Sequence, residues 1–336
     1  MNLQQKVYRK ARLQFAYAYN NLRGITRLTD RLFRDSRGLR ILVYHGLCKN
    51  DPTRFNSLFL TVKTFESHLK FFKKYFNIVS LGEVYNESLS RGRFNICITF
   101  DDGFANNYEY ALPLIHKYDV PAAFFITAIR RAGKDILWND YLAVAQKYGP
   151  SQFEFLGDRF YRNRQGQYVS ASGNRHLKEL LREKGFDDKE AFIKAFNRLS
   201  SFKLNNNDAD YWLQLTADQI KQLSSSPLAT IGCHGYYHND LSKIAFADAA
   251  IEMRRCKQFL EEITQRKLDA IAFPYGAYTR EVIREAKAIG FNKLLAADFL
   301  FSEDRADQSL RERFTVNPYI SLQNQMMAVV NGKYQT

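Results

Sequence analysis

Short apolar runs rich in β-branched and aromatic residues recur along the chain, separated by amphipathic stretches. Each run is too short for a helix and has the continuous apolar character of a strand buried on both faces. We predict seven strands, at residues 41–45, 95–100, 122–127, 229–234, 270–273, 293–297 and 313–316. Helical periodicity lies between them, at residues 62–76, 105–118, 216–224, 244–266 and 279–289. This alternation predicts a parallel α/β sheet covered on both faces, and seven strands favour a barrel.

One long section, residues 131–228, breaks the alternation. It is more polar, has a hairpin pattern at 153–162 with a turn at Gly157-Asp158, and continues with helical patterns at 175–183 and 187–201. We interpret it as an α+β insertion between consecutive barrel strands. Its aromatic residues form either a lid or sugar platform over the barrel mouth or the insertion's own core; they are Trp138, Tyr141, Phe153, Phe155, Tyr161 and Tyr168.

Residues 1–38 are predicted to form a basic amphipathic helical arm, although Gly24 weakens a single uninterrupted helix. Apolar residues recur there at three- and four-residue steps, at Phe15, Ala18, Tyr19, Leu22, Ile25, Leu28 and Leu32. The stripe either packs on the chain's own core or lies on an anionic membrane surface while arginines meet lipid phosphates. Nucleic acid is the least supported partner, and we expect none, because no nucleic-acid module follows.

Composition narrows the class of protein. The 336 residues are 46% apolar and carry a net charge of +14, and residues 1–40 hold ten Lys and Arg against two Asp, a net +8. There is no run of eighteen apolar residues and no signal-peptide pattern, and the four cysteines show no CxxC pair. We therefore expect a globular protein with reduced thiols in the cytoplasm, in peripheral contact with the inner face of the cell membrane if the arm binds lipid.

Two adjacent carboxylates, Asp101 and Asp102, follow the strand predicted at residues 95–100, in the sequence TFDDG that ends at Gly103. Burying two neighbouring carboxylates is costly unless a cation or a shared proton compensates. Neighbouring side chains on extended backbone point apart, so the two need not share one role. Asp-Asp-Gly is also a common turn, and the motif alone leaves both interpretations open.

Two histidines follow the strand predicted at residues 229–234, in the sequence HGYYH from His234 to His238. On a helical turn or tight loop this spacing brings both imidazoles to one metal ion. Surface histidines show the same spacing by chance. The position is notable because the chain has only six histidines and two of them lie at one strand end.

Three further features also lie at the ends of predicted strands. The sequence FPYG places Tyr275 between Pro274 and Gly276, either as a rigid turn whose free N–H groups point into the barrel mouth or as an ordinary turn. His45 and Asp298 end two other strands. Active sites of α/β barrels are assembled at the carboxyl ends of the strands, so we expect these features to meet.

One carboxylate with two imidazoles leaves open coordination positions, as in catalytic metal sites. A closed structural zinc site is the rival use of the same region, with the ligands His45, Cys48, Cys233, His234 and His238. Strand alternation points Cys233 away from His234, and the rival leaves the two aspartates unexplained.

Together these motifs resemble the polysaccharide deacetylase family, also described as the NodB homology domain or carbohydrate esterase family 4. TFDDG at 99–103 resembles its first motif, HGYYH at 234–238 its metal-histidine motif and FPYG at 273–276 its third motif. The resemblance covers residues 94–300, interrupted by the insertion. It implies a distorted (β/α)7 TIM-like barrel that hydrolyses the N-acetyl group of an amino sugar.

The resemblance also implies site roles. Asp102, His234 and His238 would bind Zn²⁺, or Co²⁺ or Ni²⁺ in its place, and Asp101 would be the general base that takes a proton from the metal-bound water. The backbone N–H of Tyr275 would help to hold the oxyanion. Substrate contacts are expected from Pro274, Tyr236 and Asp298.

The chain departs from the family pattern in several places. Gly235 replaces the usual Ser or Thr, and Ala272 replaces an Arg that steadies the catalytic aspartate, so another group must orient Asp101. No histidine follows His238 to act as general acid. A permuted branch of the family supplies that histidine from the first strand in a YH motif, which Tyr44-His45 resembles. We therefore expect His45 to be the general acid, with a hydrogen-bonded core histidine as the alternative, and Asp298 to orient it or to bind substrate.

The expected function is metal-dependent N-deacetylation of an amino sugar in a cell-surface glycan or its lipid-linked precursor. Two alternatives stay open: a deacylase or deformylase of a nucleotide-linked sugar, and a non-catalytic glycan-binding pseudoenzyme. Retention of both aspartates and both motif histidines argues against the pseudoenzyme.

Overall fold

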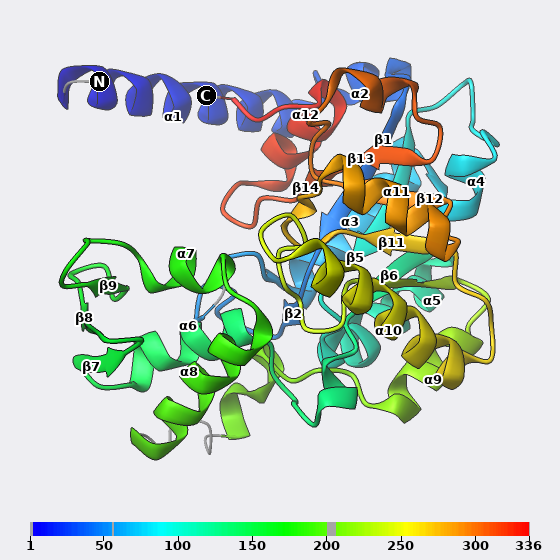
Figure 1. The fold of residues 1–336 in the computed structure, drawn as a ribbon. Coiled ribbons are helices and arrows are strands. Elements are labelled where there is room, and N and C mark those ends of the chain that lie inside the picture. Colours follow the sequence, from blue (N-terminus) through cyan, green and yellow to red (C-terminus); the bar gives the residue numbers. More distant parts are fainter. Residues whose placement is uncertain (1–2, 56, 200–205, 336) are drawn as a thin grey trace.

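A nearly closed barrel of parallel strands forms the body of the molecule (Figure 1). The computed structural model describes residues 3–55, 57–199 and 206–335. Neighbouring strands follow the order β13 (Leu310–Glu312), β12 (Lys293–Ala296), β11 (Ala270–Ala272), β10 (Ala229–Cys233), β6 (Ala122–Ile126), β5 (Asn95–Phe100), β1 (Leu39–Tyr44) and β14 (Phe314–Thr315). β4 (Asn77–Val79) also pairs with β5. The predicted barrel is confirmed.

The barrel closes through one segment that changes neighbours. β13 pairs with β12, whereas β14 pairs with β1 on the opposite edge of the sheet. Arg313 stands between the two short strands. The strand predicted at residues 313–316 corresponds to β14 alone, and β13 before it was not predicted. We call the break between β13 and β14 the seam.

Strand alternation decides which residues face the barrel interior. One apolar cluster lies inside it and includes Ile41, Cys97, Ala123, Phe125, Ala272 and Leu295. The intervening residues face the surrounding helices and include Leu42, Ile98, Phe124, Cys233, Ile271 and Leu294. Counting onward in twos places Thr99 and Asp101 on the interior side of β5, and His234 on that of β10.

Helices and short turns connect the strands, and most of them pack on the outer face. They are α3 (Val62–Tyr75), α5 (Leu112–Tyr118) after a π-helical turn η1 (Asn107–Ala111), α9 (Ala217–Ser225), α10 (Phe246–Thr264) and α11 (Arg280–Ile289). The short helix α4 (Leu81–Tyr85) instead adds Leu81 and Val84 to the interior cluster. The remaining short elements are β2 (Leu47–Cys48), β3 (Leu60–Thr61) and the 3-10 turns η2 (Ile129–Ala132), η5 (Pro274–Gly276) and η6 (Ser302–Ala306).

The insertion has its own hydrophobic core, separate from that of the barrel. Its elements are α6 (Trp138–Tyr148), β7 (Gln152–Phe155), β8 (Asp158–Arg162), β9 (Tyr168–Ser170), α7 (Leu177–Arg182), α8 (Phe186–Leu199) and η4 (Asn206–Tyr211). Helix α9 packs in the barrel core through Ile220 and Leu223, so the insertion's core ends before it, rather than at residue 228. The hairpin turn is Leu156-Gly157, both with positive φ, one residue earlier than predicted.

The insertion's aromatic residues form its core and not a sugar platform. Five of the six singled out from the sequence are buried together, namely Trp138, Tyr141, Phe153, Phe155 and Tyr168. Tyr161 is exposed. Phe153 makes edge-on ring contacts with Tyr168 and with Phe196 of α8, which link the hairpin to the helices of the insertion.

The N-terminal arm is a long helix, α1 (Leu3–Ile25), followed by the short helix α2 (Asp30–Asp35). Gly24 lies within α1, where a Cβ would come within 2.7 Å of the side chain of Gln323. That contact belongs to α12 (Leu322–Asn331), on which the C-terminal half of α1 packs while the N-terminal half extends away from the body (Figure 1). None of the helices in the described residues combines the length and apolarity needed to cross a membrane.

Candidate metal centre and active site

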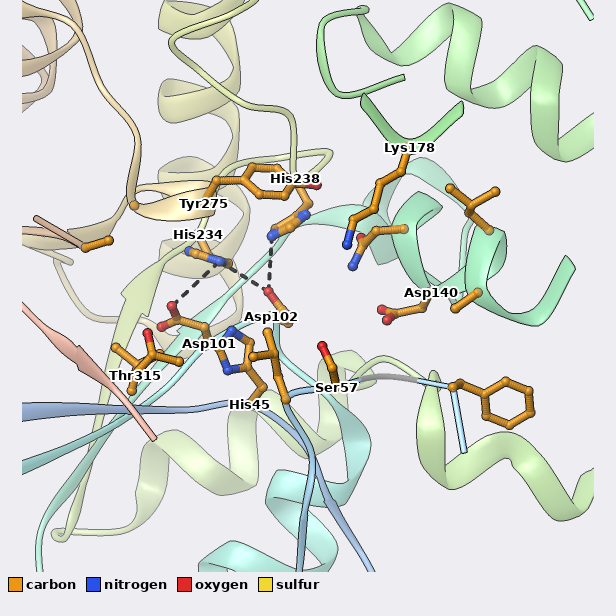
Figure 2. Close-up of a pocket in the computed structure, with 18 of the residues that line it drawn as sticks. His45, Ser57, Asp101, Asp102, Asp140, Lys178, His234, His238, Tyr275 and Thr315 are labelled. Carbon is orange, nitrogen blue, oxygen red and sulfur yellow. Dashed lines mark ion pairs between the residues drawn. The ribbon is translucent and has the colours of Figure 1, made fainter. Parts of the chain in front are cut away.

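Three buried side chains converge at the mouth of the barrel. The Oδ1 atom of Asp102 lies 3.2 Å from Nε2 of His234 and 3.1 Å from Nε2 of His238 (Figure 2). Candidate ligand atoms of the three residues all lie within 4.8 Å of one another, and no other such cluster occurs in the residues that the structure describes. The structure thus brings together the three residues predicted as metal ligands.

The hydrogen bonding of His234 tests whether the cluster fits a metal. Nδ1 lies 2.7 Å from the carbonyl oxygen of Ala272, which can only accept, so Nδ1 carries a proton. In the neutral ring Nε2 then directs a lone pair at a carboxylate oxygen of Asp102. A cation between these two acceptors resolves the conflict, and one carboxylate with two imidazoles is a donor set typical of Zn²⁺ and its neighbours.

Local backbone conformation positions these side chains. Asp102, His238 and Tyr275 all have left-handed φ angles, of 74°, 58° and 61°. Non-glycine residues adopt this conformation at a cost of about 1 to 3 kcal/mol each, which folded proteins tolerate mostly at functional sites. The change of backbone direction after β5 turns Asp102 toward the histidines, while Asp101 keeps the interior direction of the strand. The two carboxylates therefore have different surroundings.

Arg313 holds Asp101 from the seam. Its Nη1 and Nη2 atoms donate to the two carboxylate oxygens at 2.7 and 2.8 Å, and Nη1 also lies 3.3 Å from the hydroxyl of Thr99. Burial by itself raises the pKa of Asp101, but the guanidinium and His234 outweigh it, so the pKa is lowered. Asp101 is thus ionised at neutral pH and fixed in orientation. Arg313 fills the role left open by Ala272, although sequence reasoning did not single it out.

His45 lies directly after β1 and lines the same cavity, close to both aspartates in Figure 2. Burial lowers its pKa more than Asp102 and Asp101 raise it, so the ring is neutral at rest. It is not part of the candidate metal cluster. Cys48 and Cys233 both lie in hydrophobic cores, which leaves the rival structural zinc site without its sulfur ligands.

A buried carboxylate on α10 supports the histidine loop. Glu252 accepts hydrogen bonds from the backbone N–H groups of Tyr236 and Tyr237, at 3.0 and 3.1 Å, and from the side chain of Asn239 at 2.5 Å. Gly235 fits beside it with φ of 78°, where a Cβ would approach the carboxylate to 3.2 Å. Glu252 thus anchors the loop from outside the motif, and Gly235 leaves room for its carboxylate.

The insertion holds the same loop from the other side. The indole nitrogen of Trp138 donates to the carbonyl of His238 at 3.1 Å. Lys189, fully buried on α8, donates to Asn239 and lies 4.8 Å from the Trp138 ring centre. Burial lowers the pKa of Lys189 to about 8. Sequence reasoning missed Glu252, Asn239 and Lys189 because none belongs to a recognisable motif.

The site opens into a cavity of about 630 Å³ between the barrel and the insertion. The metal cluster, Asp101, His45 and Tyr275 line its inner end. Polar residues of the insertion line its outer wall, among them Asn139, Asp140, Gln146, Gln167 and Lys178. Lys178 and Asp140 point toward the cluster in Figure 2. The size and polarity suit a hydroxyl-rich small molecule or the end of a polymer.

Three predicted substrate contacts lie elsewhere. Tyr236 is buried in the barrel's outer core, where its ring packs on Tyr237. Pro274 is buried beneath the Tyr275 turn and does not line the cavity. Asp298 is exposed beside a second, smaller cavity of about 290 Å³ at the seam, so the structure does not bring it to His45. Strand-end position alone was not enough to direct these side chains inward.

Comparison with known proteins matches this geometry. The family model described as polysaccharide deacetylase aligns with residues 90–152 and 193–294, which leaves out most of the insertion. The chain belongs to the polysaccharide deacetylase family. The matched residues include the TFDDG, HGYYH and FPYG motifs. The family comprises hydrolases acting on amide bonds of acetylated polysaccharides, and the resemblance predicted from the motifs is confirmed.

Individual relatives of this polysaccharide deacetylase are distant. A putative polysaccharide deacetylase of Bacillus subtilis (strain 168), YxkH, is 27% identical over 117 residues, which span 34% of this chain and 40% of that protein. The Streptococcus pyogenes deacetylase PplD aligns over 88% of this chain and 99% of its own, with a TM-score of 0.55 and 16% identity. IcaB from Ammonifex degensii covers the same share of this chain and 98% of its own, with a TM-score of 0.53 and 17% identity. These structures support the barrel fold.

Proposed function

We propose that this polysaccharide deacetylase removes acetyl groups from N-acetylated amino sugars of a glycan, releasing acetate and leaving a free amine. The amide C–N bond breaks, the hydroxyl of a water molecule joins the acyl carbon, and the nitrogen gains a proton. The observation that carries the proposal is the Asp102–His234–His238 cluster beside an aspartate that Arg313 keeps ionised.

Asp102, His234 and His238 would hold a divalent ion, with Zn²⁺ the first candidate and Co²⁺ or Ni²⁺ as alternatives. When bound, such an ion lowers the pKa of water and polarises a carbonyl oxygen. Asp101 accepts the proton of the attacking water, since its carboxylate is ionised and cannot rotate away from Arg313. The backbone N–H of Tyr275 donates to the developing oxyanion.

His45 delivers a proton to the departing nitrogen. It lines the cavity with Asp101 and Asp102, whereas no histidine follows His238 in the chain. A ring that is neutral at rest gains a proton before it acts as an acid, so activity should fall at high pH. The role of general acid on the first strand follows the permuted branch that Tyr44-His45 resembles.

The substrate we propose is a cell-surface glycan or its lipid-linked precursor, deacetylated on the cytoplasmic side. The polar outer wall of the cavity supports a hydroxyl-rich substrate. Acetate, the product of N-deacetylation, is named in the structure of PplD. Two departures from the family pattern, the missing Arg and the missing histidine after His238, would favour a non-catalytic protein. Arg313 compensates for the missing Arg, and His45 is a candidate for the missing histidine.

Metal content and acetate release test this proposal together. We expect about one Zn²⁺, Co²⁺ or Ni²⁺ per chain in the purified protein, as a catalytic site of this kind binds one ion, and its loss in His238→Ala. Acetate release from N-acetylglucosamine oligomers should follow the metal. A protein that binds no metal after incubation with zinc would overturn the proposal in favour of a glycan-binding protein. Parallel assays with nucleotide-linked, lipid-linked and N-formylated sugars separate the remaining substrates.

A further inference from the structure

Helix α1 packs on the body through its polar side. Asn20 is 5% exposed and donates to Asn324 at 3.0 Å, while Asn324 donates to Asn21 at 3.2 Å. Gly24 brings the helix backbone close to Gln323. The face that a soluble amphipathic helix normally turns outward is here the buried one.

The apolar side of α1 faces away from the body. Tyr8, Phe15, Tyr19 and Leu22 recur at steps of seven, four and three residues and so form one stripe along the helix. Phe15 is 75% exposed and Leu22 59% exposed. The stripe lies opposite Asn20, Asn21 and Gly24 on the helix. The alternative that the stripe packs on the chain's own core is therefore wrong for Phe15, Tyr19 and Leu22.

Exposed apolar side chains are concentrated on this arm. Eight of the fifteen large exposed hydrophobic residues in the described chain lie between residues 7 and 32. Ile25 and Leu28 extend the patch toward Leu32 on α2. Single exposed hydrophobic residues are ordinary, but a contiguous group bordered by charge marks an interaction surface.

Cations border the stripe on both helices. Arg9, Arg12, Arg27, Arg31 and Arg34 are exposed, and Arg23 lies 5.5 Å from the Tyr19 ring centre. Residues 1–40 carry a net +8, so two copies meeting through this face would bring like charges together. Anionic lipid headgroups have the complementary charge, and the layer beneath them accepts apolar side chains.

We infer that α1 docks the protein on the surface of an anionic lipid bilayer, lying in the interface with its outward apolar stripe buried among the lipids. Tyr8 and Tyr19 suit that boundary because each has an apolar ring and a polar hydroxyl. In the view of Figure 1, α1 extends to the same side of the barrel as the insertion that lines the cavity. Docking does not depend on the proposed chemistry.

Vesicle sedimentation of the full chain tests the inference. We expect binding to phosphatidylcholine vesicles that contain one-third phosphatidylglycerol and much weaker binding to pure phosphatidylcholine. Replacing Phe15→Asp together with Leu22→Asp should lower the partition by more than about tenfold, since both apolar side chains then stay in water. Arg9→Gln with Arg12→Gln should lower it by about fivefold for each charge removed.

The matched control is Phe246→Asp with Ile251→Asp, because these two residues are exposed on α10. This control should bind like the wild type. Failure of the wild type to bind anionic vesicles would overturn the inference. So would an equal loss of binding in the control and in Phe15→Asp with Leu22→Asp. A dimer in solution that Phe15→Asp with Leu22→Asp dissociates would overturn it in favour of self-association. All variants should release acetate equally from soluble N-acetylated oligomers, which keeps docking separate from the chemistry.

Discussion

The two loops that meet at the barrel mouth are held in different ways. The loop after β5 has its proposed base, Asp101, fixed by the guanidinium of Arg313 through two short hydrogen bonds. The loop after β10 has its histidines fixed by Glu252, Asn239 and Trp138, none of which binds the imidazole rings. A base must stay ionised and so needs a nearby charge. An imidazole binds a metal through an unprotonated nitrogen. The hydrogen bonds with Glu252 and Trp138 fix the backbone of the loop, while Nδ1 of His234 donates to the Ala272 carbonyl and leaves Nε2 to face Asp102.

The largest expected effect comes from removing the carboxylate of Asp101, the proposed base. Asp101→Asn should lower acetate release by about 10²- to 10⁴-fold, because the amide cannot accept the proton of water. Metal content should stay at the wild-type level, since Asp101 is outside the cluster. Asp298→Asn, at an exposed position outside the site cavity, is the control and should change neither quantity. Loss of metal in Asp101→Asn would show that both carboxylates serve as ligands.

Removing the guanidinium of Arg313 should have the next largest effect. Arg313→Met leaves Asp101 buried and unpaired, which we expect to cost about 3 to 5 kcal/mol of unfolding free energy. Arg313 also lowers the pKa of Asp101, so the acidic limb of the kcat/KM profile should move to higher pH in the variant. The stability that the ionised Asp101 contributes is present above its ordinary pKa and is lost as pH falls through the lowered value.

Arg313→Lys is the matched variant for this measurement. It keeps the charge but not the two parallel hydrogen bonds, so both the pH limb and the unfolding free energy should lie between those of wild type and Arg313→Met. Identical pH profiles in all three proteins would contradict the assignment of Asp101 as the base that Arg313 controls.

In the loop that carries the two histidines, Glu252→Gln should lower the affinity for the metal ion. Changing an outer partner of a metal site typically lowers affinity by about 10- to 100-fold, and the amide can accept only part of the three hydrogen bonds that Glu252 receives. Excess zinc should restore activity, whereas it should not restore Asp101→Asn. Glu261→Gln on the same helix, away from the loop, should bind metal normally.

The smallest effect is expected at the contact with the insertion. Trp138→Phe removes the hydrogen bond to the His238 carbonyl, a loss of about 1 kcal/mol that should appear in both stability and metal affinity. Tyr141→Phe removes the hydrogen bond to the Ile193 carbonyl in the same core and should lower stability alone. Metal affinity is measured by competition with a chelator. Equal affinity in the two variants would contradict the prediction that the insertion supports metal binding through Trp138.

Periodicity and motifs predicted the part of this site that is local in sequence. The barrel, Asp101 with Asp102 and the two histidines follow from strands that end in chemically distinct residues. The role of Arg313 was not predicted, because this residue lies in the seam, where the strand that pairs with β12 ends and the strand that pairs with β1 begins. An alternation argument was still available, since an arginine two residues before Thr315 shares its interior direction.

The supporting groups could not be found in the same way. Glu252 lies on the apolar side of α10 between Ala249 and Cys256, where a charge is costly unless it is hydrogen-bonded, and this was the one indication available. Lys189 belongs to the insertion, whose orientation on the barrel no local pattern encodes. The arm shows the opposite case: its stripe was visible, but the face that packs on α12 was not predictable from periodicity.

The seam ties the proposed base to the closure of the barrel. Asp101 and Arg313 are 212 residues apart in sequence. Arg313 lies between β13, which pairs with β12, and β14, which pairs with β1. A ribosome-bound chain that ends before the seam carries every candidate metal ligand but lacks the cation that prepares the base. In mild denaturant, fraying of β13 and β14 would withdraw Arg313 from Asp101 while the remaining strands are still folded, so the residue that closes the barrel also sets the charge state of the proposed base.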